Sequence, residues 1–344
     1  MFTKKVVFYT ILVVTSVAST FLFGEILVRV FSPAPSLYPR YKFSSTYGFQ
    51  VYEDTKMVHT LPSKYTFLYS VNKYGYRGKA IDPAQYDQKT VLVLGDSNSF
   101  GIGVNDGEEY PAKLAEALKE DYIVVNLANP GWGLTQEIRR YYDFGILYHP
   151  IVVILQFDSN DIDDNFDNMV TTVKDGRFIF HNSGNKVNVV KRYLSQSIIQ
   201  KSQLYNFVRQ RTFDLYEKWY VRRAESKYRV EWQDKNLSSP KEEFYNTLLT
   251  AFADDLCRNN IRLLFISVNN KLNGFPHVEA NIYRLHAEGK LNYVDVRPWF
   301  EGVPNYESAE GHVWGRKAHT IIGRNLASTI SMLNDQYSQT RIVP

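Results

Sequence analysis

The chain has 344 residues, of which 44% are hydrophobic and 22% are charged, and its formal net charge is +4. These fractions lie near the average for globular proteins, which excludes collagen-like and wholly disordered chains. The single cysteine, Cys257, excludes an intrachain disulfide framework and a zinc site built from cysteines. A charge of +4 is too small to indicate nucleic acid binding by itself.

Residues 1–32 are predicted to form a membrane anchor. Lys4 and Lys5 precede residues 6–24, a run of 19 residues without a charge. As a helix this run would be about 28 Å long, close to the roughly 30 Å of a bilayer's hydrocarbon core. A cleaved signal peptide is the rival interpretation, but the apolar run is long for one and no A-x-A site follows it. We expect a single-pass span of the inner or plasma membrane, with the bulk of the chain on the extracytoplasmic (periplasmic) side.

A linker and a β-rich leader are expected from 33 to 89. Prolines at 33, 35 and 39 mark the linker. The alternating, Tyr-rich segment from Tyr65 to Val71 predicts a strand, and the segment from Asn72 to Gly78 predicts a turn.

The rest of the chain alternates between strand and helix patterns. Short apolar runs predict five strands buried on both faces, at 90–94, 123–127, 151–155, 262–268 and 293–296. Helical patterns occur at 110–118, 135–142, 244–257 and 317–332. This alternation predicts a three-layer α/β/α sandwich of flavodoxin-like architecture, with a five-stranded parallel sheet. We place this domain at 90–335 and a C-terminal tail at 336–344.

Polar or glycine-containing segments follow four of the predicted strands. They are Gly95-Asp96-Ser97, Asn126 to Gly133, Asn160-Asp161 and Glu307 to His312. Because sites in parallel α/β sheets form beyond the carboxyl ends of the strands, we expect these segments at one edge of the sheet. A serine, a histidine and amide donors at one edge are the groups that acyl transfer requires.

Each of these residues has an expected role. Ser97 is the candidate nucleophile, which needs a base because a free hydroxyl barely ionises, and His312 is that base. The backbone N–H groups of Ser97 and Gly131 and the side-chain amide of Asn160 are predicted to form the oxyanion hole. Asp96 and Asp161 are expected to support the site by capping a helix or anchoring a loop. A plain strand-to-helix turn at Ser97 is the structural alternative.

From about Asn72 to Ala327 the sequence resembles the SGNH hydrolases, also called GDSL-like esterases. Gly95-Asp96-Ser97 is similar to the family's first block, and the three later segments are similar to its glycine, Asn-Asp and acid-x-His blocks. The resemblance implies the membrane-anchored bacterial type of this family. It also implies that an acid orients His312, and Glu310 occupies that position.

The sequence departs from the family at the acid. The family usually has Asp where Glu310 stands, and Trp314 and Ala318 replace the Asn and Gly that often follow. Glu can orient an imidazole through the same hydrogen bond with a longer arm. Glu307 remains an alternative acid, and a degenerate member of weak activity remains an alternative reading.

Two other kinds of site are not expected. Gly101-x-Gly103 suggests a dinucleotide fingerprint, but Asp106 stands where its third glycine belongs and no acidic ribose ligand follows. The acidic segment 161–167 lacks the glycine of a calcium loop, and Thr172 stands where that loop has Glu. No metal and no cofactor is expected.

About 100 residues separate the third and fourth strands, which predicts a helical insertion at 165–240. Within it, residues 186–229 hold eleven Lys and Arg against three Asp and Glu, a net charge of +8. One interpretation is a basic, aromatic face that binds anionic lipid headgroups or an acidic glycan. The other is a solvated helix face whose aromatics pack on the core. Nucleic acid is not an expected partner.

The leading functional hypothesis is a serine esterase of the cell envelope that acts on an acylated glycan or a small ester. The family resemblance implies O-acetyl groups on polysaccharide as the substrate. An O-acetyltransferase with the same residues is one alternative. A non-catalytic envelope protein that binds glycan through a degenerate site is another.

Overall fold

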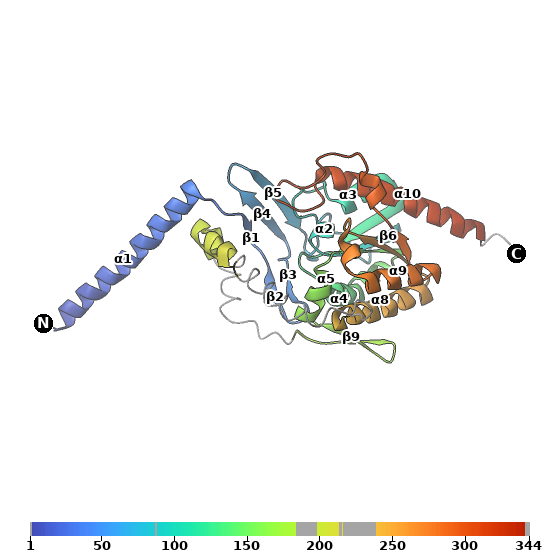
Figure 1. Cartoon of the computed structure of the whole chain (residues 1–344), viewed down its shortest axis with the longest axis horizontal. Coiled ribbons are helices and arrows are strands. Elements are labelled where there is room, and N and C mark those ends of the chain that lie inside the picture. The colour runs from blue at the N-terminus through green and yellow to red at the C-terminus, as the bar shows by residue number, and fades with distance from the viewer. Residues whose placement is uncertain (1, 87, 184–197, 213–214, 216–238, 341–344) are drawn as a thin grey trace.

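The structure is a computed structural model that describes residues 2–86, 88–183, 198–212, 215 and 239–340 (Figure 1). A five-stranded parallel sheet lies at its centre, in the order β12-β11-β8-β6-β7. The strands are β6 (Lys89–Leu94), β7 (Tyr122–Asn126), β8 (Val152–Phe157), β11 (Arg262–Ser267) and β12 (Asn292–Val294).

Helices cover both faces of this sheet (Figure 1). On β6, Val91 and Val93 face α3 (Tyr110–Leu118) and α10 (Arg316–Thr340), within one apolar cluster. Leu92 and Leu94 belong to the cluster on the other face, which is covered by three helices. These are α4 (Leu134–Asp143), α8 (Pro240–Arg258) and α9 (Pro276–Ala287). Successive residues of a strand point to opposite faces, so both faces of the sheet are buried. The predicted fold class is confirmed.

Two helices of four and seven residues begin at the carboxyl edge of the sheet. They are α2 (Ser97–Phe100) and α5 (Asp161–Asp167). Short 3₁₀ helices complete the described domain: η1 (Lys119–Asp121), η2 (Gly145–Tyr148), η3 (Ile198–Lys201), η4 (Lys271–Gly274) and η5 (Arg297–Phe300).

The leader is rich in β-structure. It forms an antiparallel sheet β1-β4-β5 and a small β2-β3 pair. The strands are β1 (Ser36–Tyr38), β2 (Lys42–Ser44), β3 (Gly48–Gln50), β4 (Thr55–Leu61) and β5 (Tyr65–Val71). Met57 and Tyr69 of this sheet pack in one apolar cluster with Phe100 and Ile102, which lie just after Ser97. The leader therefore lies against the loop that follows α2.

Helix α1 (Phe2–Phe31) projects away from the rest of the chain (Figure 1). Its segment Lys4–Phe31 has a mean hydropathy of 2.1 over its most apolar window, and none of that window is buried. Length and composition allow α1 to be a membrane span or a signal sequence.

The insertion after β8 begins with an antiparallel hairpin, β9 (Thr171–Lys174) and β10 (Arg177–Phe180), before η3 and a helix at 203–212. Asp175 and Gly176 form its turn with φ of 50° and 70°, and a two-residue turn of type I′ requires positive φ at both positions. Most of the basic segment 186–229 lies outside the described residues. At the other end, α10 continues to Thr340, within the segment 336–344 that was expected to be a tail.

Candidate active site

Ser97 lies where β6 passes into α2 at the carboxyl edge of the sheet. Asp96 caps α2, because its side chain accepts a hydrogen bond from Asn98 N at 2.8 Å. Ser97 is half-buried, and its hydroxyl has no hydrogen-bond partner among the described residues. The backbone N–H groups of Ser97 and Gly131 likewise have no partner within the described ranges. Both the hydroxyl and the two amides are thus available to a ligand.

His312 and Glu310 form a hydrogen-bonded pair in the loop between η5 and α10. Glu310 Oε1 lies 2.6 Å from His312 Nδ1 and accepts a second hydrogen bond from His312 N at 3.1 Å. The Glu310 side chain is 6% exposed and the His312 side chain 27%. Because a carboxylate only accepts, Nδ1 carries the proton and Nε2 of the neutral ring keeps its lone pair.

Carboxylates near His312 stabilise its charged form. Burial would lower the pKa of His312, but the hydrogen bond and charge of Glu310 outweigh it, with help from Asp96 and Asp158, and raise this pKa. Burial also acts against the ionised form of Glu310, yet His312 lowers the pKa of this carboxyl. Burial and then the charge of Asp158 raise the pKa of Asp96 to about 6. Asp96, the neighbour of Ser97, and His312 therefore influence one another electrostatically.

Gly103 joins the loop after α2 to the loop that carries the Glu310–His312 pair. Its backbone oxygen accepts a hydrogen bond from Ser308 Oγ at 2.8 Å. Its φ is +86°, and a Cβ at this position would collide with Ser308 Oγ and Glu310 Oε1. Only glycine allows this close approach together with a left-handed backbone. The contact joins the loop that follows Ser97 and α2 to the loop that carries His312.

Two predicted site residues lie on the loop after β8. Asn160 is exposed, and its Nδ2 donates to Asp164 Oδ2 at 2.7 Å. One N–H of this amide is thus bonded to Asp164, and the NH₂ group carries a second, so its role in the oxyanion hole stays a prediction. Asp161 is buried, and its Oδ2 accepts a hydrogen bond from Asp158 N at 3.0 Å, which holds the loop.

Several residues near the pair were not singled out by the sequence. Asp158 is buried, accepts a hydrogen bond from Asn98 Nδ2 at 3.1 Å and directly precedes the Asn-Asp block, so its position in the chain was an available signal. His59, Tyr65 and Tyr69 come from the leader hairpin, and the charge of Glu310 affects the pKa of all three. No spacing in the sequence indicates that the leader reaches Glu310.

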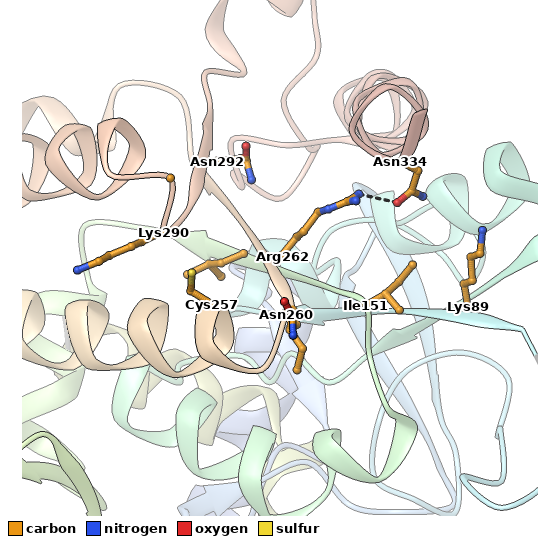
Figure 2. Close-up of a pocket in the computed structure, with 11 residues that line it drawn as sticks. Lys89, Ile151, Cys257, Asn260, Arg262, Lys290, Asn292 and Asn334 are labelled. Atoms are coloured by element: carbon orange, nitrogen blue, oxygen red, sulfur yellow. Dashed lines mark hydrogen bonds between the residues drawn. The ribbon is translucent and has the colours of Figure 1, made fainter. Parts of the chain in front are cut away.

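A cavity of about 400 Å³ lies elsewhere in the domain (Figure 2). Lys89 begins β6, Arg262 begins β11, and Ile151 directly precedes β8, so the cavity lies at the amino-terminal edge of the sheet. Arg262 is hydrogen-bonded there to Asn334 of α10. The candidate site lies at the opposite edge and does not include this cavity.

No family model and no curated protein sequence matches the chain. Among solved structures, a protein from Desulfitobacterium hafniense named for the G-D-S-L family of lipolytic proteins matches 70% of this chain and 99% of its own, at 12% identity and a TM-score of 0.43. A psychrotrophic esterase from Pseudoalteromonas matches 72% of this chain and 100% of its own, at 13% identity and a TM-score of 0.41. A carbohydrate acetylesterase from Sinorhizobium meliloti matches 72% of this chain and 100% of its own, at 9% identity and a TM-score of 0.38. Their names agree with the predicted family. Likenesses this distant carry no argument about activity, which rests on the residues of the chain itself.

Proposed function

We propose that the chain is a serine esterase in which Ser97, His312 and Glu310 act together. The observation that carries this proposal is the hydrogen bond between His312 Nδ1 and Glu310 Oε1, at the same sheet edge as Ser97. It leaves Nε2 as a proton acceptor while the carboxylate stabilises the imidazolium that forms during reaction.

In the first half of the reaction, Ser97 Oγ bonds to the ester carbonyl carbon as its proton passes to His312 Nε2. The carbonyl oxygen becomes an oxyanion, which the N–H groups of Ser97 and Gly131 stabilise. The bond to the alcohol oxygen then breaks, and His312 returns the proton to the leaving alkoxide.

In the second half, His312 Nε2 takes a proton from water while the water oxygen attacks the acyl-enzyme. Ser97 leaves with the proton from His312, and the acid is released. Glu310 stays ionised throughout and holds the imidazole in one tautomer.

We place this activity at the cell envelope, on O-acetyl groups of a polysaccharide or glycoconjugate. The family resemblance supports the substrate, and the apolar helix α1 supports attachment to a membrane. The inner membrane and an extracytoplasmic catalytic domain are part of this proposal. Binding of an acidic glycan or anionic lipid by segment 186–229 stays a prediction.

The test uses the full chain in detergent and an activated acetyl ester. Ser97→Ala and His312→Ala should each lower kcat by about 10⁴-fold or more. His181→Ala, a change at an exposed histidine bonded to Thr172, serves as the matched control. Turnover that survives Ser97→Ala would exclude this nucleophile. A much smaller loss for Glu310→Ala than for His312→Ala would transfer the orienting role to another acid such as Glu307.

Product analysis separates the alternatives. Release of the free acid supports the esterase, whereas acyl groups recovered on an added sugar support the O-acetyltransferase. Absence of turnover with every acyl ester, together with retained glycan binding, would favour the non-catalytic protein.

A further inference from the structure

The β4–β5 hairpin of the leader flanks the Glu310 side of the candidate site. Alternation along β5 places Tyr65, Phe67 and Tyr69 on one face, while Thr66 and Leu68 point to the other. Tyr69 is fully buried, and its hydroxyl oxygen accepts a hydrogen bond from Gly103 N at 3.0 Å. The hairpin is therefore fixed to the same glycine that contacts Glu310.

Beyond Tyr69, the same face ends in three half-buried rings. Tyr65 and Phe67 stack with centroids 5.4 Å apart and planes 24° apart, and His59 meets the Tyr65 ring edge-on at 5.3 Å. Such rings offer flat apolar area that is already ordered by its neighbours, so a ligand would not have to immobilise it.

Polar groups border these rings. Tyr69 accepts from Gly103, so its own proton must go to His59 Nδ1 at 3.0 Å, since otherwise it would be buried without a partner. His59 therefore carries its proton on Nε2, and burial lowers its pKa to about 4, so the ring is neutral at ordinary pH. Neither His59 Nε2 nor the Tyr65 hydroxyl has a hydrogen-bond partner among the described residues.

These features select one kind of ligand. An alkyl chain laid on the rings would cover a His N–H and a Tyr hydroxyl without satisfying either, which costs free energy. A sugar ring presents both an apolar C–H face to the rings and hydroxyl groups to these two polar atoms.

We propose that His59, Tyr65 and Phe67 form a subsite for the sugar ring of an acylated glycan, next to Glu310 and His312. This inference rests on the proposed esterase function and locates the part of the protein that recognises the glycan. The leader hairpin then belongs to the substrate-binding site.

The experiment compares two substrates of the full chain in detergent, partially acetylated cello-oligosaccharides and p-nitrophenyl acetate. The measured quantity is the ratio of kcat/KM for the oligosaccharide to kcat/KM for the small ester. Tyr65→Ala and Phe67→Ala should each lower this ratio by about tenfold or more, as loss of a ligand-stacking ring does. Thr66→Ala and Leu68→Ala, on the opposite face of the same strand, should leave the ratio unchanged.

A binding measurement separates this inference from the function on which it rests. Unacetylated cello-oligosaccharide should bind Ser97→Ala protein, and the additional change Tyr65→Ala should weaken that binding by about tenfold. If the chain hydrolyses no ester but shows this pattern, the esterase proposal fails and the sugar subsite stands. If Tyr65→Ala and Thr66→Ala change the kcat/KM ratio and the binding equally, the subsite proposal fails. It also fails if neither substitution changes them, even when the esterase is active.

Discussion

Glu310 sets the protonation of His312, the residue on which the proposed reaction depends. The neutral imidazole is the base, so kcat/KM must rise with pH through the pKa of His312. That pKa is raised because Glu310 outweighs burial, with Asp96 and Asp158 adding to its effect, while His59 faces the pair as a neutral ring.

Glu310→Gln should therefore move the acidic limb of the pH profile to lower pH. The substitution removes the negative charge that favours imidazolium, so the base form persists in more acidic solution, while kcat falls because the forming imidazolium loses its partner. The measurement is kcat/KM for an activated ester across the titration of His312. An unchanged midpoint would mean that Glu310 does not control this group.

Gly103 is expected to affect catalysis through its close approach to Glu310, and not only through its left-handed backbone conformation. Gly103→Ala should lower kcat by about tenfold or more, because a Cβ would push Glu310 away from His312. Gly107→Ala is the matched control: its φ of +80° resembles the +86° of Gly103, but nothing lies within 4 Å of its Cβ. Gly107→Ala should lose about 1–2 kcal/mol of stability, because it places alanine in a left-handed conformation. Gly103→Ala should lose more, because its Cβ also collides with Ser308 and Glu310. Equal kinetic effects would refute the role of the contact.

At the scale of elements, the strands of the central sheet can be predicted from the sequence, whereas the packing of the leader cannot. The apolar run 151–155 predicts a buried strand, and β8 occupies Val152–Phe157. The prediction works because a strand buried on both faces is a continuous apolar run in the sequence. The loops beyond such strands could be placed by topology alone. The hydrogen bond between Tyr69 and Gly103 joins two residues far apart in the chain, and no sequence pattern predicts their contact. It could be found only from the structure. The orientation of Asn160 likewise depends on a local partner, Asp164.

Arg77 connects the leader to the loop behind the nucleophile. Its side chain is fully buried and donates to the backbone oxygens of Phe100, Gly101 and Val104. It also lies 3.5 Å from the carboxylate of Glu109, whose side chain is 4% exposed. One guanidinium thus satisfies several buried acceptors that water cannot reach.

Arg77→Met should destabilise the protein by about 3–5 kcal/mol, because it leaves Glu109 buried without its cation. The double change Arg77→Met with Glu109→Gln should recover part of this loss, since the uncompensated charge is gone. Urea unfolding of the full chain in detergent measures both. A loss below about 1 kcal/mol, typical of exposed ion pairs, would show that the buried network contributes little.

At the scale of the whole molecule, helix α1 is held to the rest of the chain by hydrogen bonds at its carboxyl end. Near the end of α1, Glu25 accepts hydrogen bonds from Ser202 Oγ at 2.7 Å and from the backbone N–H groups of Gln203 and Leu204 at 2.9 and 2.8 Å. These two amides begin the helix at 203–212, where N–H groups lack partners within their own helix. Just after α1, Ala34 N donates to the Gln203 side chain at 2.7 Å.

These contacts favour a retained anchor, because cleavage of a signal peptide after Glu25 would remove a hydrogen-bond partner of Ser202, Gln203 and Leu204. Mass measurement of protein isolated from membranes should therefore find residues 6–24 still attached. Glu25→Ala should loosen the junction and speed proteolysis of the linker at 32–40 about tenfold, because local opening exposes that segment. Thr20→Ala, which alters only a hydrogen bond within α1, should leave the proteolysis rate unchanged. A mature chain that begins after Glu25 would contradict the anchor and leave the first turn of the helix at 203–212 without this cap.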